Sequence, residues 1–305
     1  MKSAIKSILH GKTSADKIDL YTRRFPFTPI DKIRHTLSRF PNSVSNKITD
    51  TTCELVSNTS MINDIPIILS ILEGLVFDIL SESAYIGPLR ASGSRFNRIQ
   101  ELAVTRINST GDNTAMYIYS LSPSELASFN DLMIRACGHI IEVEESGSGH
   151  VSLKIGRHGQ AHFENIADVG FGFSQLIPVV AQLHAVRERL TDPDSTQGGD
   201  VIFAVEQPEL HLHPAMQANL ADLFVGAVKS KTQKMKNTTI LVETHSEMII
   251  SQLGVLIAEG EISPEEVAIY FVRKDDSIGE STLSEVSFDG NGIISEWPIG
   301  FFSAN

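Results

Sequence analysis

The segment from Val201 to Pro214, VIFAVEQPELHLHP, constrains the fold of this chain more than any other part of the sequence. It opens with an uninterrupted apolar run, which is typical of a strand covered on both faces of a parallel sheet. Glu206 ends that run, and open α/β folds bind ligands at the carboxyl ends of such strands. A carboxylate there could hold Mg²⁺, whereas an isolated strand-end glutamate more often only accepts hydrogen bonds.

Apolar strands alternate with helical patterns around this segment, which predicts an α/β fold with a doubly wound sheet and flanking helices. The predicted elements are a helix at 174–190, a strand at 201–205, a helix at 214–228, a strand at 239–242 and a helix at 246–258. We expect two further strands, at 267–274 and 281–288, to extend this sheet or to pair at its edge.

The part of the chain before this layer is less regular. We interpret residues 1–83 as a helical arm, in which the apolar run at 65–80 forms a helix buried on several sides. Gly87-Pro88 then closes a short strand in SAYIGPLR. Further on, we predict a helix at 124–137 and a hairpin at 140–157, in which IIEVEE and VSLKIGR flank the turn SGSGH.

Two more motifs lie on either side of the acidic strand. In DVGFGFSQ, Gly170 and Gly172 allow close backbone approach, while Ser174 and Gln175 are expected to open a helix whose amides favour an anion. An ordinary glycine turn capped by serine is the alternative. In ETHSE, His245 follows a buried strand, and the next residue, a serine, can cap the following helix.

These three motifs, in this order, resemble those of ABC-type and SMC-like AAA ATPases, especially the OLD-family and RecF-like branch. Val201 to Pro214 looks like their Walker B segment, Asp168 to Gln175 like their signature motif, and Glu243 to Glu247 like their switch-histidine segment. YIGPLR and the C-terminal DGNGIISEWPIGFF resemble segments of a bacterial subgroup. The likeness covers roughly residues 84–305, which divides into the C-terminal part of an ATPase domain at 84–275 and a strand with a Trp-Pro-x-Gly-Phe-Phe tail at 276–305.

The resemblance implies ATP and Mg²⁺ as cofactors and a head-to-tail dimer closed by ATP. Glu206 would hold the magnesium, directly or through water, and His245 would sense the γ-phosphate and the attacking water. The signature residues would bind the nucleotide held by the opposite subunit; they are Gly170, Gly172, Ser174 and Gln175.

The chain departs from the family at Gln207, where many relatives carry a catalytic glutamate. An amide can hold the attacking water but cannot accept its proton, so we expect slow hydrolysis. A phosphate loop of the form Gly-x4-Gly-Lys-[Ser/Thr] is also missing, because Gly11-Lys12-Thr13 has Lys6 in place of the first glycine. We therefore expect a P-loop NTPase-type fold with an incomplete N-terminal lobe, from a longer ATPase, a split gene or a lineage that lost the loop.

The partners expected from this resemblance are a second copy or a protein that carries the Walker A loop, and a separate nuclease effector in a nucleic-acid-directed or phage-defence system. The net charge of −12 gives nucleic-acid binding no support. Arg90, Arg95 and Arg98 could form a basic surface, although such arginines are more often solvated. The two cysteines and the lack of an export signal or membrane-length apolar run indicate a cytoplasmic protein without a membrane partner.

Two other functions stay open. One is a non-catalytic interaction or regulatory subunit, which the glutamine and the missing loop favour. The other is a metal-dependent hydrolase, whose ligands would be Glu206, Glu209, His211, His213 and His245. For the two histidines of HLHP, contacts at the helix start or in a dimer are better supported than metal coordination, because the leucine between them is expected in the core and a helix starts at the proline.

Overall fold

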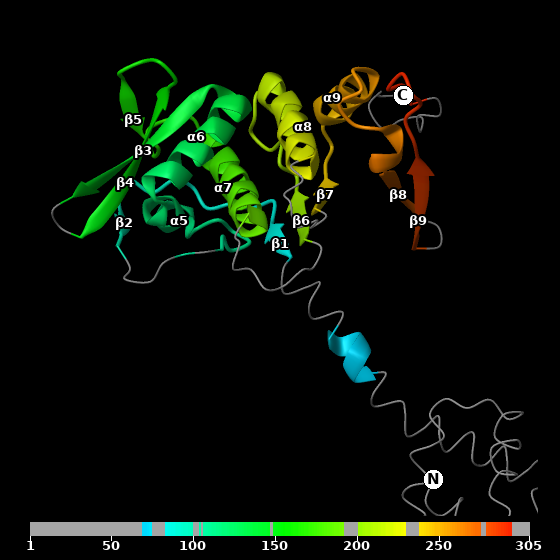
Figure 1. Ribbon diagram of the computed structural model, residues 1–305, viewed down its shortest axis with the longest axis horizontal. Helices are drawn as coiled ribbons and strands as arrows, with labels where there is room; N and C mark the ends of the chain where they lie inside the picture. The colour runs from blue at the N-terminus through cyan, green and yellow to red at the C-terminus, as the bar shows by residue number, and fades with distance from the viewer. Residues whose placement is uncertain are drawn as a thin grey trace, which may run out of the picture. The chain divides into compact units, whose positions relative to one another are not determined.

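The computed structural model describes residues 69–74, 83–99, 104, 106–146, 149–191, 201–229, 238–275 and 279–294 (Figure 1). The chain divides into two compact units, Met1–Asp78 and Ile79–Asn305. In the first unit the described residues form a helix at 69–74, inside the predicted 65–80, but Leu69, Ile71 and Leu72 are at least half exposed. The expected burial of this helix is therefore wrong for its described turns. The rest of the predicted arm up to residue 82, which includes Gly11-Lys12-Thr13, and the predicted Trp-Pro-x-Gly-Phe-Phe tail lie outside the described residues.

A three-stranded parallel sheet forms the centre of the second unit. Its strands are β1 (Ala84–Ile86), β6 (Val201–Glu206) and β7 (Thr238–Glu243), in the order β1-β6-β7. The helices α7 (Phe171–Thr191) and α8 (Pro214–Lys229) pack against these strands. This confirms the predicted α/β class with a parallel sheet and flanking helices.

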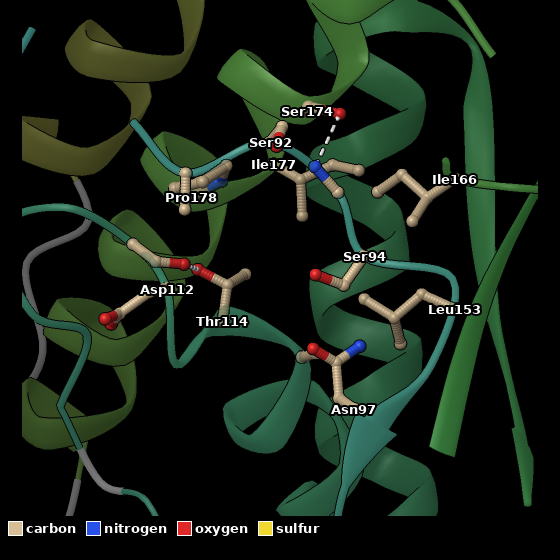
Figure 2. A pocket seen from close by; sticks show the side chains of 14 residues that line it. Ser92, Ser94, Asn97, Asp112, Thr114, Leu153, Ile166, Ser174, Ile177 and Pro178 are labelled. Carbon is tan, nitrogen blue, oxygen red and sulfur yellow. Dashed lines mark hydrogen bonds between the residues drawn. The ribbon is translucent and has the colours of Figure 1, made fainter. Parts of the chain in front are cut away.

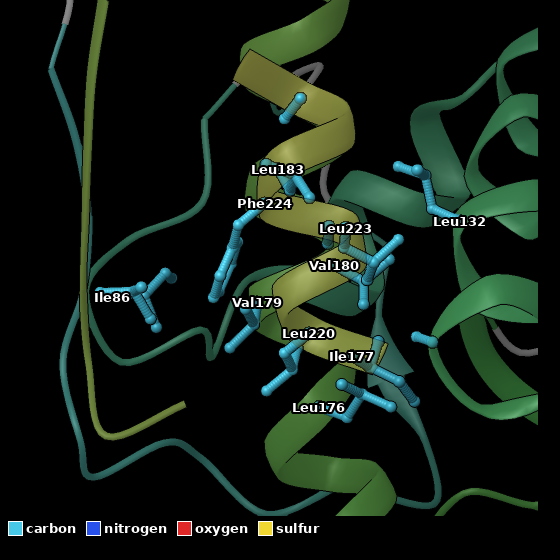
Figure 3. Close-up of a cluster of buried hydrophobic side chains, with 14 of the residues drawn as sticks. Ile86, Leu132, Leu176, Ile177, Val179, Val180, Leu183, Leu220, Leu223 and Phe224 are labelled. Atoms are coloured by element: carbon cyan, nitrogen blue, oxygen red, sulfur yellow. The ribbon is translucent and has the colours of Figure 1, made fainter. Parts of the chain in front are cut away.

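Part of the hydrophobic core lies between the sheet and these two helices (Figure 3). Phe203 and Ile86 are fully buried on the strands, Leu183 and Leu220 are fully buried on the helices, and the Phe203 ring packs against that of Phe224 with centroids 6.5 Å apart. Burying side chains of this size stabilises the fold by about 1.5–3 kcal/mol each. The core therefore fixes β6, and with it the position of the acidic residue at the end of that strand.

The opposite face of the parallel sheet stays open to solvent within the described residues. Tyr85, Ala204 and Leu241 are neighbours in the strand register and form a row across this face. Leu241 is 62% exposed and Tyr85 44%. Parallel sheets are normally covered on both faces. This sheet has the apolar sequence of a buried layer, but within the described residues only one of its faces is covered.

A second sheet is antiparallel, with the order β2-β4-β3 and β5 paired to β4. It consists of β2 (Asn97–Arg98), β3 (His139–Ser146), β4 (His150–Arg157) and β5 (Phe163–Asn165). The helices α5 (Thr114–Ser120) and α6 (Pro123–Cys137) pack against β4 and β3 respectively. The predicted hairpin and the helix at 124–137 are confirmed, whereas α5 was not predicted.

The helix α9 (Glu247–Ala258) packs against α8, and a short 3₁₀ helix, η1 (Pro264–Glu266), follows it. The strands β8 (Ile269–Asp275) and β9 (Glu280–Val286) form an antiparallel sheet of their own. The expectation that they join the parallel sheet is therefore wrong, because β8 and β9 pair with each other. No helix among the described residues is long and apolar enough to cross a membrane.

Candidate functional site

The carboxyl edge of the parallel sheet carries two acidic side chains. Glu206 and Glu243 are register partners at the ends of β6 and β7. The Tyr85 hydroxyl donates a 2.7 Å hydrogen bond to Oε1 of Glu206. This bond, together with burial and the two nearby carboxylates, raises the pKa of Tyr85. Magnesium is bound in proteins by one or two carboxylates together with water and phosphate oxygens, so this pair of acids fits the predicted cation.

Gln207, the next residue, adopts a left-handed backbone with φ of 41°. Its N–H donates to the carbonyl of Glu243 at 2.7 Å, which joins the ends of β6 and β7. Its own carbonyl accepts from Nη2 of Arg90 at 3.3 Å. A residue with a Cβ is strained in this conformation by about 1 kcal/mol or more, so these contacts hold an otherwise unfavourable turn in place.

Glu209 connects this turn to the switch segment. It is 8% exposed, and its Oε1 accepts a 2.7 Å hydrogen bond from the backbone N–H of His245. Ser246 caps α9, as predicted, by accepting from the N–H of Ile249, and its hydroxyl donates to Oε1 of Gln217 at 2.6 Å. The structure therefore places His245 at the same edge as the two carboxylates, with its side chain exposed.

The signature motif starts its helix earlier than predicted. α7 begins at Phe171, so Ser174 and Gln175 lie inside its first turns and are only 6% and 2% exposed. The Ser174 hydroxyl accepts from the N–H of Gly93 at 3.1 Å, and the Gln175 amide donates to the carbonyl of Arg90 at 3.3 Å. The Ser174 and Gln175 side chains therefore form hydrogen bonds inside the protein.

The two glycines of the motif differ in their surroundings. A Cβ on Gly172 would lie 2.6 Å from the carbonyl oxygen of His211, whereas a Cβ on Gly170 would meet nothing within 4 Å. His211 has a φ of 62°, and its ring packs edge-on against Phe171 with centroids 4.9 Å apart. The predicted close backbone approach is confirmed for Gly172, where the signature motif touches the turn that follows β6.

A cavity of about 100 Å³ adjoins the signature helix (Figure 2). Polar groups line one part of it, including Ser92, Ser94, Asn97, Asp112 and Thr114, and the Ser174 hydroxyl lies beside it. Pockets that bind drug-sized ligands measure about 300–1,000 Å³, so this cavity is too small for a nucleotide. The sheet edge, and not the cavity, is the candidate nucleotide site.

Arg90 and Tyr85 are the contributors to the site that the sequence reasoning did not identify. Both lie in YIGPLR, and the only signal was an arginine shortly after a strand that could pair beside the acidic one. Arg90 is 6% exposed, so neither the possible basic surface nor the favoured solvated position describes it. Arg95 also does not contribute a free charge, because it forms an ion pair with Asp168.

The metal-dependent hydrolase hypothesis requires several ligands in one place. Among the described residues, no group of three or more His, Cys, Asp or Glu side chains is placed to hold a metal ion. His213 instead starts α8, where its Nδ1 accepts from the N–H of Ala215 at 3.3 Å. The leucine between the two histidines, Leu212, is buried as predicted. These contacts confirm the role of the segment at the helix start.

A parallel sheet flanked by helices, with a strand-end acid and a following switch segment at one edge, fits a P-loop NTPase-type fold. The sequence matches the AAA ATPase domain family over residues 43–250, which is more than half of the chain. The chain therefore belongs to the AAA ATPase domain family. Residues 262–303 match a second family, described as a protein of unknown function (DUF3696).

Among solved structures, the chain is similar to SMC proteins. One structure comes from a study of ATP-driven dimerization and DNA-stimulated activation of SMC ATPases. It is 16% identical to this chain with a TM-score of 0.37, and the match covers 53% of this chain and 82% of that chain. The Smc head with a coiled coil and joint from Pyrococcus yayanosii has 15% identity and a TM-score of 0.37, with 58% and 29% covered. An Smc head bound to the C-winged helix domain of ScpA has 13% identity and a TM-score of 0.38, with 59% and 47% covered. The chain thus spans less than half the length of the last two, and no curated protein matches it.

Proposed function

We propose that this chain supplies one half of an ATP-hydrolysing site in a nucleotide-gated dimer. The observation that carries the proposal is the meeting of Glu206, Gln207 and His245 at the carboxyl edge of the parallel sheet. In this reading Glu206 holds Mg²⁺, the Gln207 amide positions the attacking water, and His245 contacts the γ-phosphate. Mg²⁺, when bound with ATP, neutralises charge on the phosphates.

The phosphate-binding loop comes, in this proposal, from a lobe that carries a Gly-x4-Gly-Lys-[Ser/Thr] sequence. The open face of the sheet supports such a lobe, because the Tyr85-Ala204-Leu241 row lacks a described cover. A cover on this face would lie beside Glu206, which points to the same side of the sheet as Tyr85. The lobe would therefore bring its phosphate loop close to the magnesium carboxylate.

The dimer in this proposal is closed by ATP, with the signature motif of each chain facing the nucleotide of the other. The exposed backbone around Gly170, at the start of α7, offers amides for a phosphate, while Ser174 and Gln175 hold that helix start in place. We call this chain together with the lobe that carries the phosphate loop the complemented chain. ATP with Mg²⁺ should shift the complemented chain to a larger species in light scattering. An unchanged mass would contradict the closed dimer. A role in nucleic-acid-directed defence with a separate nuclease effector extends the same proposal.

Hydrolysis is expected to be slow, because an amide at position 207 cannot accept a proton. The test measures ATP binding and phosphate release by the full chain, alone and with the lobe. Gln207→Glu should raise the turnover rate, and Glu206→Gln should abolish turnover while leaving ATP binding. Multiple turnover at ordinary ATPase rates that is unchanged in Gln207→Ala would refute the proposed water-positioning role.

A second candidate is a non-catalytic regulatory subunit with the same fold. The glutamine at 207 and the missing phosphate loop favour it. The same measurements separate the two candidates. Turnover in the complemented chain supports the ATPase, whereas a lobe that binds the chain without any turnover supports the regulatory subunit.

A further inference from the structure

The segment from Tyr85 to Arg95 touches both motifs of the candidate site. On one side, the Tyr85 hydroxyl binds the Glu206 carboxylate. On the other side, Gly93 donates its N–H to the Ser174 hydroxyl, and Arg95 forms an ion pair with Asp168 at the start of the signature motif. We name residues 85–95 the bridging segment, because they connect the end of β6 to the start of α7.

Arg90 is the centre of this segment. Its Nη2 donates to the carbonyl oxygens of Glu206 at 2.5 Å and Gln207 at 3.3 Å, while its own carbonyl accepts from the Gln175 amide. One residue therefore contacts the last residue of β6, the strained residue after it, and the signature helix.

The environment of the Arg90 side chain is energetically unfavourable for a charged group, which argues against an incidental role. The side chain is 6% exposed, and burial lowers its pKa to about 10. Its Nε and Nη1, like Oε2 of Glu209, have no hydrogen-bond partner among the described residues. A buried charge with unused donors destabilises a fold unless its remaining contacts compensate for the lost hydration.

The Glu209 carboxylate, which raises the pKa of Arg90 against the effect of burial, and the two carbonyl contacts compensate for part of this cost. A φ of 41° is unfavourable for a residue with a Cβ, and the backbone groups of Gln207 are held by the Glu243 carbonyl, the Leu210 N–H and the Arg90 guanidinium. Without the guanidinium, the Gln207 carbonyl keeps only its 3.3 Å bond from the Leu210 N–H, so the peptide after Gln207 is less restrained against rotation to a common backbone conformation. The Gln207 side chain and the Glu206 carboxylate would then lose their common orientation.

We propose that Arg90 is a positioning residue, which holds the end of β6 in its strained conformation and couples it to the signature helix through the bridging segment. The meaning of this coupling rests on the proposed function, since the two coupled motifs are the magnesium and signature parts of the ATP site. Arg90 itself contacts neither nucleotide nor metal in this proposal. It acts through Gln207 and Gln175.

The first test measures amide hydrogen exchange of the full chain without nucleotide. Arg90→Met should speed exchange of the Gln207 and Gly93 amides by about tenfold or more, because the contacts on both sides of the bridging segment loosen. The amide of Ile141, which donates to Asn130 in the second sheet, should change by less than about threefold. The exposed Arg98→Met is the matched control and should change none of them. Uniform acceleration of all three amides would show a general loss of stability and overturn the proposal.

The second test asks whether a change at Gln207 can rescue the effect of Arg90→Met, which is expected only if Arg90 acts through Gln207. Glycine adopts positive φ without strain, so in the Arg90→Met background Gln207→Gly should return the exchange protection of the amide at position 207 to within about threefold of wild type. In the wild-type background, where the Arg90 guanidinium already holds the turn, the same change should alter this protection by less than about threefold. If Arg90→Met speeds exchange of this amide equally with glutamine and with glycine at position 207, Arg90 does not act through this residue and the proposal fails.

The third test uses the complemented chain with ATP and Mg²⁺. Arg90→Met should lower kcat by about tenfold or more while KM for ATP changes by less than about threefold, since the lost orientation matters in the transition state. Equal changes in kcat and KM would overturn the positioning role. The exchange and rescue tests need no nucleotide, so wild-type protein that fails to bind ATP would refute the proposed function and leave the coupling by Arg90 standing.

Discussion

Replacing Gly172 with alanine tests whether the signature motif and the turn after β6 are held in direct contact. The new Cβ would lie 2.6 Å from the His211 carbonyl oxygen, and real Cβ atoms essentially never approach closer than 3.0 Å. One of the two backbones must therefore move by at least about 0.4 Å. His211 already has a φ of 62°, so the turn has little freedom to yield.

The magnitude follows from the cost of overpacking. Inserting a methyl group into a closely packed contact destabilises a protein by about 1–3 kcal/mol, which for a unit of this size corresponds to a Tm lower by roughly 3–10 °C. Alanine also favours the first turn of α7, which offsets up to about 1 kcal/mol of that loss. We therefore expect Gly172→Ala to lower the free energy of unfolding in urea by about 1–2 kcal/mol net.

Gly170→Ala is the matched control, because its Cβ meets no atom within 4 Å and the residue lies in the same motif. It should leave the free energy of unfolding within about 0.5 kcal/mol of wild type. In the complemented chain, Gly172→Ala should also slow ATP turnover, since it displaces the turn that follows Glu206. Equal stability of the two variants would refute the inference that the glycine at 172 is required by contact with His211.

Three further predictions follow from single contacts. Ser246→Ala should lower the free energy of unfolding by about 2 kcal/mol in urea denaturation, because α9 loses its cap and Gln217 loses its hydroxyl donor; a loss under about 0.5 kcal/mol would contradict this. Burial lowers the pKa of His184 to about 4, so the unfolded chain binds more protons between pH 6.5 and 4, and stability should fall as the pH drops through this window. The contribution reaches up to about 3 kcal/mol, and His184→Gln should remove this part of the pH dependence in urea titrations, whereas an unchanged slope would refute the assignment. Leu241→Lys should leave the Tm of the chain alone nearly unchanged but weaken binding of the complementing lobe in calorimetry, while Leu89→Lys, at an exposed position off the sheet, should not.

The elements that the sequence predicted correctly are those whose signals are local. The apolar run ending in Glu206 predicted a strand at its observed place, although only one face of that strand has a described cover, while Ser246 predicted a helix cap and Leu212 a buried position before a helix. Each of these signals depends on residues within a few positions of each other. The expected class and the position of the acid at the sheet edge followed from them.

The features that were missed depend on contacts between distant parts of the chain. Arg90 is buried because β1 pairs with β6, which no local pattern around the arginine indicates. Ser174 and Gln175 turn inward because the bridging segment lies against them. Helix α5 was missed because the polar stretch before it obscured its short apolar pattern. Tertiary contacts decide such positions, and the burial of a charged side chain is the least visible of them in a sequence.

If the proposed lobe covers the open face of the parallel sheet, folding and assembly of this protein are thermodynamically coupled. A lobe that binds the Tyr85-Ala204-Leu241 row of the folded chain, and not the unfolded one, stabilises the fold by mass action. At a lobe concentration one hundred times its Kd, this linkage adds about 2.7 kcal/mol to the free energy of unfolding. The abundance of the chain in a cell would then depend on the supply of its lobe, and an excess of either would be the fraction exposed to proteases and chaperones.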